Sequence, residues 1–302
     1  LGDVYKRQQI RERCLLMTDL EKICADAYEA RVKIGTLDTD IKNKVLNDAA
    51  DNLLKAEKEI LEANKRDVTT AEENMKAKSM IDRLSLDHDR LLGMADGLRQ
   101  IAKLADPIGE VMSMAKRPNG LIIGKRRVAI GVVGIIFEAR PNVTSDAFGL
   151  CFKTGNCVIL KGGSDAINTN IAIVKALKKA LTDNLVSDAA LALIESTDRE
   201  TTNAFMKMDQ YVDVLIPRGG AGLIQNVVKN ATIPVIQTGT GNCHVYVDKD
   251  ADFDMAVNII NNAKTQRISV CNACESIVVH SAIAEEFCLL YTSPSPRDRS
   301  LS

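Results

Sequence analysis

The stretch Val128-Ala-Ile-Gly-Val-Val-Gly-Ile-Ile-Phe137 is followed at once by Glu138-Ala-Arg-Pro-Asn-Val-Thr144. The first part is apolar and rich in branched side chains, whereas the second is polar and contains proline. A short apolar run that ends at such a polar segment predicts a buried strand whose C-terminal end opens into a loop.

Further short apolar runs follow this one, and helical patterns separate them. The runs cover residues 157–160, 191–194, 212–216 and 235–236, and the helical patterns cover 168–181, 200–208 and 221–229. Alternating strands and helices predict an α/β fold, with a Rossmann-type parallel sheet covered by helices on both faces. In such sheets, ligands bind beyond the carboxyl ends of the strands.

The segment before this alternation is predicted to be largely helical. Thr18-Asp-Leu-Glu21 is a capping-box pattern, which indicates the start of a first helix. Apolar residues at helical spacing predict a second helix from Ile41 to Leu61 and a third over residues 87–104. The turn Pro118-Asn-Gly120 predicts a β-hairpin over about residues 109–127, of a kind that often serves in subunit pairing.

A second unit of the same class is predicted to begin near Asn242. It contains a strand at 243–247, a helix at 253–264, a loop around Cys271 and a strand at 276–279. We therefore expect a cofactor-binding domain over 17–240 and the start of a second α/β domain over 241–287.

The two ends of the chain are related to each other as DNA. Gly2 to Gln8 can be encoded by a sequence whose reverse complement, in another frame, encodes Cys288 to Pro294. This relationship is typical of translated sequencing-adapter DNA and not of two natural tails. We expect residues 1–16 and 288–302 to be artefactual, Met17 to be the natural start, and the natural protein to continue beyond residue 287.

Composition limits the class of protein. The 302 residues are 46% hydrophobic and 26% charged with a net charge of −1, as expected for a soluble globular protein. The balanced charge gives no support for binding nucleic acid or a membrane surface, and no apolar run is long enough to span a bilayer. The eight cysteines lack the spacing of a disulfide framework, so we expect reduced thiols and a cytoplasmic location.

Cys271 is a candidate nucleophile because it lies between a predicted helix and a predicted strand, where a thiol pKa can be lowered. The alternative is a small buried side chain, which free cysteine usually is. Cys271 and Cys274 also form a Cys-x-x-Cys pattern, which is compatible with a redox pair or half of a zinc site. Cys243 and His244 are adjacent in a strand and point to opposite faces, so we expect no metal site. His244 and His280 are expected to be packed or surface histidines.

Two glycine-rich segments follow predicted strands, although the dinucleotide fingerprint Gly-x-Gly-x-x-Gly is absent after the first strand. Leu160-Lys-Gly-Gly-Ser164 places a lysine where it could hold a ribose or its 2′-phosphate, with glycines that allow close backbone approach. Pro217-Arg-Gly-Gly-Ala-Gly222 suits a phosphate at a helix N-terminus. A solvated lysine in the first segment, and a tight turn without ligand in the second, are the alternatives.

Asn142 ends the opening stretch and could donate a hydrogen bond to a developing oxyanion, although asparagine is also common in loops. Together with the motifs above, this segment carries a family resemblance. Five motifs occur in order between about residues 17 and 287: Glu-Ala-Arg-Pro-Asn-Val-Thr, Leu-Lys-Gly-Gly, Leu-Ile-Pro-Arg-Gly-Gly-Ala-Gly-Leu, Cys-His-Val-Tyr-Val-Asp, and Asn-Ala-Lys-Thr-Gln-Arg followed by Cys-Asn. The chain resembles the γ-glutamyl phosphate reductase (glutamate-5-semialdehyde dehydrogenase) family of the aldehyde dehydrogenase superfamily.

The resemblance implies NADPH-dependent reduction of L-glutamyl 5-phosphate to glutamate 5-semialdehyde with release of phosphate, the second step of proline synthesis. Cys271 matches the family's catalytic cysteine, which forms a thioester, and Asn142 matches the oxyanion-stabilising asparagine. Lys161 matches the lysine at the adenosine ribose, where a basic group suits the 2′-phosphate of NADPH. Gly162, Gly219 and Gly220 are expected to line the cofactor cleft.

One departure from hydrolytic aldehyde dehydrogenases concerns Gln237, which stands where those enzymes carry a glutamate general base. A glutamine cannot take a proton from water, and a reductase that starts from an acyl phosphate does not need hydrolysis. Arg140, Arg267 and Ser269 are candidates for holding the substrate's carboxylate or phosphate, because bidentate arginine suits both. The resemblance also implies a homo-oligomer and allows a glutamate 5-kinase as partner.

Three alternatives differ from this interpretation. A hydrolytic aldehyde dehydrogenase is disfavoured by Gln237. A fragment without a competent active site is the expectation for the chain as it stands, because a domain cut soon after its nucleophile lacks partners for its last strand. A Cys-x-x-Cys redox or metal protein would be supported by bound zinc or by a reversible Cys271–Cys274 disulfide.

Overall fold

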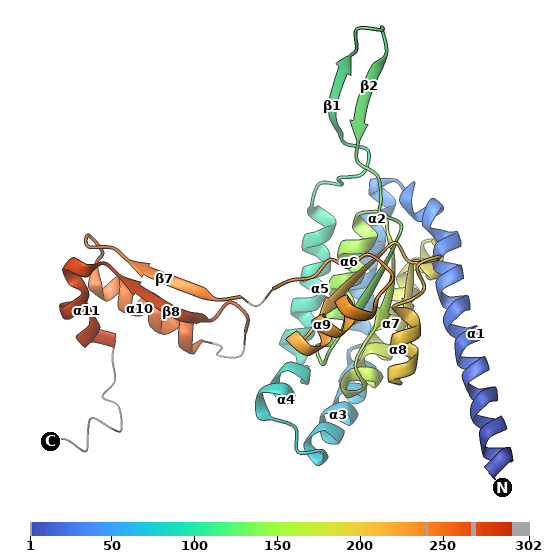
Figure 1. Cartoon of the computed structure of the whole chain (residues 1–302), viewed down its shortest axis with the longest axis horizontal. Helices are drawn as coiled ribbons and strands as arrows, with labels where there is room; N and C mark the ends of the chain where they lie inside the picture. Colours follow the sequence, from blue (N-terminus) through green and yellow to red (C-terminus); the bar gives the residue numbers. More distant parts are fainter. Residues whose placement is uncertain (1, 240, 267–269, 292–302) are drawn as a thin grey trace. The chain divides into compact units, whose positions relative to one another are not determined.

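The computed structural model describes residues 2–239, 241–266 and 270–291, and the side chains of these residues except 2–18, 79 and 291. It divides into two compact units, Leu1–Gln237 and Thr238–Ser302 (Figure 1). Each unit is described by itself. Within the described residues, no helix is long and apolar enough to cross a membrane.

The core of the first unit is a four-stranded parallel sheet in the order β5-β4-β3-β6. Its strands are β3 (Val132–Phe137), β4 (Cys157–Lys161), β5 (Leu191–Leu193) and β6 (Val214–Arg218). Every residue of β3 and β4 is buried, as their continuous apolar runs predict for central strands covered on both faces. The predicted α/β class is therefore confirmed.

Helices cover both faces of this sheet. They are α1 (Gly2–Gly35), α2 (Thr39–Lys55), α3 (Glu57–Glu73), α4 (Lys78–Leu84), α5 (His88–Lys103), α6 (Asn142–Lys153), α7 (Ile167–Asp183), α8 (Arg199–Phe205) and α9 (Ala221–Asn230), with 3-10 turns at Ser164–Ala166 and Asp188–Ala190. The chain moves outward from β3 to β5 through α6 and α7, then returns through α8 to the other side of β3. Because such crossovers are right-handed, α6 and α7 lie on one face and α8 lies on the opposite one, where α1 also packs (Figure 1).

Several boundaries predicted from the sequence are wrong. Helix α1 runs through Thr18, so the capping-box pattern does not start a helix there. The single helix predicted from Ile41 to Leu61 is divided at Ala56, whose backbone leaves helical geometry (φ −90°, ψ 8°). Residues 235–236 form no strand and contribute one bridge, between Val235 and Leu215.

Gly134 in β3 is needed because neighbouring side chains occupy the space where a Cβ would lie. That atom would clash with the Leu215 side chain and lie 2.9 Å from Phe205 Cζ. Gly134→Ala is therefore expected to lower the free energy of unfolding by about 1–3 kcal/mol through overpacking. Urea denaturation followed by circular dichroism measures this change.

Gly93→Ala is the matched control. Gly93 lies on the exposed side of α5, and nothing lies within 4 Å of an added Cβ. Replacing a helical glycine there should raise the free energy of unfolding by about 0.5–1 kcal/mol. Equal effects of the two substitutions would contradict the packing argument.

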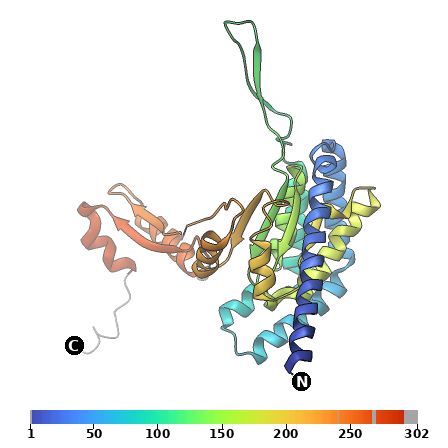
Figure 2. The ribbon, with the colours of Figure 1, turned by 45° about the vertical axis from the view of Figure 1, so that its right-hand side comes forward.

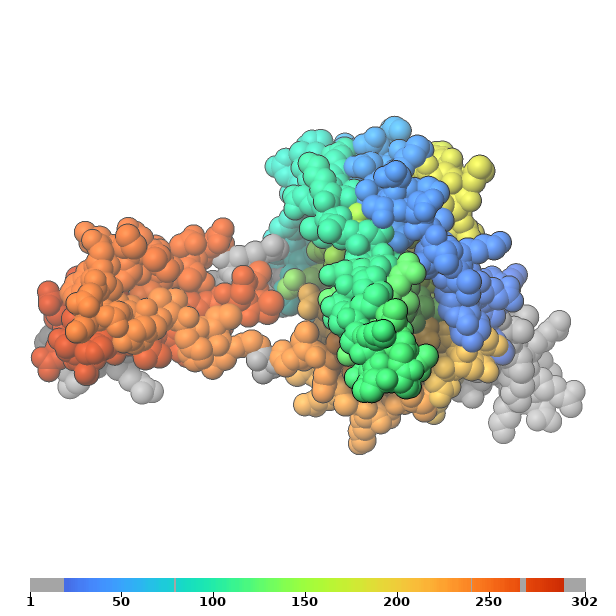
Figure 3. All heavy atoms as spheres, turned by 90° about the horizontal axis from the view of Figure 1, so that it is seen from above, coloured from blue at the N-terminus to red at the C-terminus, as the bar shows by residue number. Residues whose placement is uncertain are grey.

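Strands β1 (Val111–Lys116) and β2 (Ile122–Arg126) form the predicted antiparallel hairpin, which projects from the first unit (Figure 2). Every residue of both strands is exposed, and no other element covers the hairpin in the view from above (Figure 3). Large apolar side chains are among the exposed ones: Val111, Met112, Met114, Leu121, Ile122 and Ile123. The hairpin itself is observed, and its role in oligomerisation stays a prediction.

The second unit contains the parallel pair β7 (Cys243–Val247) and β8 (Cys274–Val279). Two helices, α10 (Phe253–Thr265) and α11 (Ala284–Tyr291), and a 3-10 turn at Ser281–Ile283 accompany it. Its small core consists of Val247, Ala256, Ile260 and Phe287. The described part of α11 includes residues that the sequence assigned to an artefactual end, and that assignment stays a prediction.

Among the side chains described in the first unit, three cysteines belong to its core. Cys24 on α1, Cys151 on α6 and Cys157 on β4 are all buried. Burial disfavours the thiolate and raises the pKa of each of these thiols to about 12. These thiols are therefore packing groups at neutral pH.

Candidate active site

In the first unit, the candidate site lies at the carboxyl edge of the sheet. Strand β3 pairs with β4 on one side and β6 on the other, with Ile136 opposite Lys161 and Phe137 opposite Arg218. The order of the strands reverses at β3, and this is the position where open α/β sheets bind ligands. Both glycine-rich turns predicted from the sequence therefore flank the end of β3.

Lys161 ends β4 and is only 4% exposed. Its Nζ donates one hydrogen bond, 3.0 Å long, to the carbonyl oxygen of Gly162. Burial lowers the pKa of this ammonium group, and the charge of Asp198 opposes that shift. Because an ammonium group has three N–H donors, Lys161 retains capacity for an anionic or hydroxyl oxygen of a ligand.

Packing beneath the turn requires glycine at position 162, which the sequence did not indicate. A Cβ at this position would lie 2.5 Å from Asn170 Nδ2 and 3.4 Å from Phe137 Cζ. Asn170 is fully buried, and its Oδ1 accepts a 3.0 Å hydrogen bond from Thr144 Oγ1. Its Nδ2 has no hydrogen-bond partner among the described residues. Packing beneath the turn thus restricts residue 162, in addition to any approach of a ligand from above.

Gly219 and Gly220 lead from β6 into α9, and Gly220 is the N-cap residue of that helix. The Gly220 N–H donates to Glu138 Oε2 at 3.0 Å. A Cβ at Gly219 would lie 2.7 Å from Glu138 Cδ, so a larger residue there would displace this carboxylate. The sequence analysis assigned no role to Glu138. Its position directly after β3, at the edge of the sheet where ligands bind, could have indicated one.

Asn142 is the first residue of α6 and is exposed. Its Nδ2 donates to Asp146 Oδ2 at 3.0 Å, one turn further along the helix. Burial raises the pKa of Asp146, while the hydrogen bond from Asn142 and the charge of Arg218 act in the opposite direction. One N–H of the amide is thus held, and the second remains for a ligand. Arg140 lies half-buried in the same loop.

In the second unit, Cys271 is exposed in the segment between α10 and β8. Its carbonyl oxygen lies 3.8 Å from Cys243 Sγ, at the start of β7. Cys274 is buried in β8 and its Sγ donates to the Ser276 carbonyl oxygen at 3.3 Å. The described residues contain no group of three His, Cys, Asp or Glu side chains arranged to hold a metal ion. The other two predicted substrate ligands, Arg267 and Ser269, lie outside the described residues.

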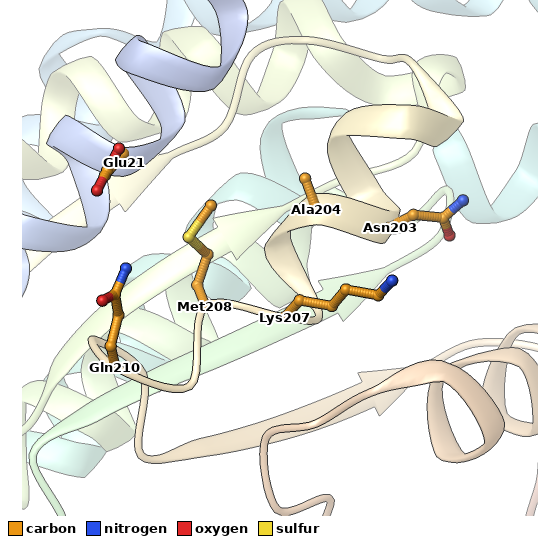
Figure 4. A pocket seen from close by; sticks show the side chains of 6 residues that line it. All are labelled: Glu21, Asn203, Ala204, Lys207, Met208 and Gln210. Carbon is orange, nitrogen blue, oxygen red and sulfur yellow. The ribbon is translucent and has the colours of Figure 1, made fainter.

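An open pocket of about 440 Å³ lies elsewhere in the first unit, and Figure 4 shows the side chains that line it. Its lining residues are Glu21, Asn203, Ala204, Lys207, Met208 and Gln210. Residues 203–210 precede β6, which places the pocket at the amino edge of the sheet. This pocket is therefore distinct from the candidate site at the carboxyl edge.

The described chain thus has a parallel sheet with two glycine-rich turns at its carboxyl edge, followed by a second α/β unit with an exposed cysteine. The family model for the aldehyde dehydrogenase family matches residues 15–293. The chain belongs to this family.

Within the family, several γ-glutamyl phosphate reductases are similar to the chain. The chain is 99% identical over 271 residues to the curated γ-glutamyl phosphate reductase of Agathobacter rectalis, a match that covers 90% of this chain and 65% of that relative. The crystal structure of the reductase from Thermotoga maritima superposes with a TM-score of 0.83 at 43% identity, covering 90% of this chain and 66% of that one. The reductase from Saccharomyces cerevisiae gives a TM-score of 0.67 at 30% identity, with 90% and 68% covered.

These findings confirm the resemblance inferred from the motifs and the aldehyde dehydrogenase-like fold. The chain spans about 65% of the length of the curated relatives that it matches. The assignments of individual site residues stay predictions.

Proposed function

We propose that the protein to which this chain corresponds reduces L-glutamyl 5-phosphate to L-glutamate 5-semialdehyde, with NADPH as reductant and release of phosphate. The observation that carries this proposal is the 99% identity over 271 residues to a γ-glutamyl phosphate reductase. An exposed cysteine in the segment between α10 and β8 supports it, because acyl transfer needs an accessible thiolate.

The first unit fits a dinucleotide phosphate at three places. Lys161 is a buried cation with donor capacity left for an anion. Gly220 lies at the start of α9, where the helix dipole favours negative charge, and its N–H already donates to an anionic oxygen, that of Glu138. Gly162 and Gly219 keep both turns free of side chains. We assign the 2′-phosphate to the Lys161 turn and the diphosphate to the turn at 218–220.

In the proposed mechanism, the Cys271 thiolate attacks the acyl carbon of the substrate and forms a thioester, and phosphate leaves with the electron pair of the broken carbon–oxygen bond. NADPH would supply the hydride that reduces the thioester to the aldehyde, and the broken carbon–sulfur bond would return its electron pair to Cys271 as the thiolate. Asn142 donates its free N–H to the oxyanion that develops during attack. Arg140, Arg267 and Ser269 are the proposed ligands of the substrate's carboxylate and phosphate.

Gln237 supports a reductase over a hydrolase. It is exposed at the end of the first unit, and its amide cannot act as a general base for water. A thioester that water does not attack persists until hydride transfer, so the acyl group is not lost by hydrolysis.

The proposal extends to the surroundings of the enzyme. The exposed apolar hairpin β1–β2 is the proposed contact in a homo-oligomer, because an exposed apolar hairpin gains stability by pairing with another chain. A cytoplasmic location and a glutamate 5-kinase as supplier of the acyl phosphate complete the proposal.

Lys161→Met tests the cofactor assignment in this chain. The substitution keeps most of the side-chain volume and removes the charge, so NADP+ binding should weaken by about 10- to 100-fold, the loss of one hydrogen bond between charged groups. NAD+ binding should weaken less, by about 2- to 5-fold, because NAD+ has no 2′-phosphate and offers only uncharged ribose hydroxyls to this lysine. Isothermal titration calorimetry measures both dissociation constants.

Lys229→Met provides the control, since Lys229 is exposed in the last turn of α9 and its loss changes the net charge equally. It should leave both affinities unchanged. Equal weakening of NADP+ and NAD+ by Lys161→Met would contradict the assignment of the 2′-phosphate to this lysine.

A further inference from the structure

We propose that Glu138 is an internal competitor of the cofactor: its carboxylate occupies the Gly220 N–H that the cofactor's diphosphate needs, and it thereby sets the cofactor affinity. This inference rests on the proposed function, and it gives a role to a residue that the reaction itself does not require. Glu138 acts through the Gly220 turn and touches no reacting atom, so its role is one of control.

The position of Glu138 follows from the sheet. It is the first residue after β3, and its own N–H donates to the Arg218 carbonyl oxygen at 3.2 Å, which continues the pairing of β3 with β6. This contact holds the Glu138 backbone beside the turn at 218–220. On its other side, a Cβ at Gly163 would lie 3.7 Å from Glu138 Cα. The Glu138 backbone therefore lies between the two glycine-rich turns, at the reversal of strand order, and its carboxylate lies at the turn over 218–220.

The side chain then makes a specific contact. Glu138 Oε2 accepts from Gly220 N–H at 3.0 Å, and Cδ would lie 2.7 Å from a Cβ at Gly219. The carboxylate lies where the glycine pair leaves room for an anion, at the positive end of α9. At the N-terminus of α9, the exposed Glu138 carboxylate therefore makes the hydrogen bond that a phosphate oxygen of the cofactor would make.

Two anions cannot share this donor. A diphosphate that approaches Gly220 must displace the Glu138 carboxylate and then remain near its charge, so binding loses a charge-assisted hydrogen bond and incurs like-charge repulsion. When the cofactor leaves, the carboxylate returns to the amide. Since an oxidised cofactor has to dissociate in every turnover, this exchange favours its release.

Glu138→Gln tests the inference in the full chain. The glutamine retains an oxygen that can accept from Gly220 N–H, but it removes the charge. We expect NADP+ to bind about tenfold more tightly, the difference between a charged and a neutral competitor. Adenosine 2′-monophosphate, which lacks the diphosphate, should bind with unchanged affinity. Titration calorimetry with both ligands, and the urea midpoint of each variant, supply the measurements.

Glu195→Gln is the charge control. Glu195 is exposed and follows β5 at the same edge of the sheet, so its loss changes the local field without touching the turn. It should alter NADP+ affinity by less than about twofold at physiological ionic strength, because exposed charges are screened.

The outcomes separate the two proposals. Equal or weaker NADP+ binding in Glu138→Gln, with the unaltered chain binding NADP+, would overturn the inference and leave the proposed function in place. Tighter binding of both NADP+ and adenosine 2′-monophosphate would also overturn it, because the effect would then not depend on the diphosphate. Failure of the unaltered chain to bind NADP+ would overturn the proposed cofactor site and this inference with it.

Discussion

Replacement of Cys271 by alanine is expected to lower turnover by about 10⁴-fold or more. The thiolate is the proposed nucleophile, and no other exposed thiol lies in the same segment, since Cys274 is buried in β8. Without a thioester, the substrate has no covalent route to the aldehyde. The measurement is phosphate-dependent formation of NADPH from glutamate 5-semialdehyde and NADP+ in the reverse direction.

This experiment requires the full-length relative from Agathobacter rectalis, which is 99% identical over 271 residues, because the present chain spans 65% of its length. Cys274→Ala in the same protein is the control, and it should retain turnover within about threefold because a buried thiol is not a nucleophile. Substantial turnover in the Cys271 variant would refute its role.

Asn142→Ala in the same relative is expected to reduce kcat by about 10²- to 10³-fold, with a much smaller change in KM, because an oxyanion donor acts in the transition state. The structure gives this amide a defined orientation. Asp146 Oδ2 holds one N–H of Asn142 at 3.0 Å, so the side chain is fixed with its second N–H available. An alanine removes the donor without disturbing the buried side of α6.

Asn230→Ala is the matched control for this substitution. Asn230 is also an exposed helical asparagine, and its Nδ2 contacts Asn226 one turn away, but it lies at the far end of α9. It should leave kcat unchanged. A loss confined to KM in the Asn142 variant would mean that the amide binds substrate and does not stabilise the oxyanion.

The sheet was predictable because its signal is local. Strands β3 and β4 are buried on both faces, so their residues have to be apolar throughout, and an uninterrupted apolar run reveals them. The glycine-rich turns were also visible, since Lys161 ends the apolar run of β4 and Gly219 follows β6 after Pro217 and Arg218.

Helix α6 could not be recognised from the same kind of pattern. It is buried on most of its surface, including the polar residues Thr144 and Ser145, so its sequence lacks the contrast between an apolar and a polar face. The division at Ala56 was hidden for a related reason, because alanine favours helix and no glycine or proline marks the break.

The site contacts that the sequence missed are tertiary. Glu138 and Gly220 are 82 residues apart, and Thr144 and Asn170 are 26 apart. The order of the strands brings Glu138 beside Gly220, and the packing of α6 against α7 brings Thr144 to Asn170. No spacing rule along the chain predicts either contact. Sequence reasoning therefore located both turns but not the Glu138 carboxylate that contacts one of them.

The unequal burial of the thiols has a consequence for oxidative damage. Cys24, Cys151 and Cys157 remain protonated in the core, with pKa values raised to about 12, and peroxide reacts with exposed thiolates far faster than with buried thiols. Among the cysteines whose side chains are described, those accessible to solvent lie in the second unit: Cys271 is exposed, and Cys243 and Cys288 are partly exposed. An oxidant would therefore modify Cys271, the proposed nucleophile, before it damaged the core, and the fold would survive the loss of the proposed activity.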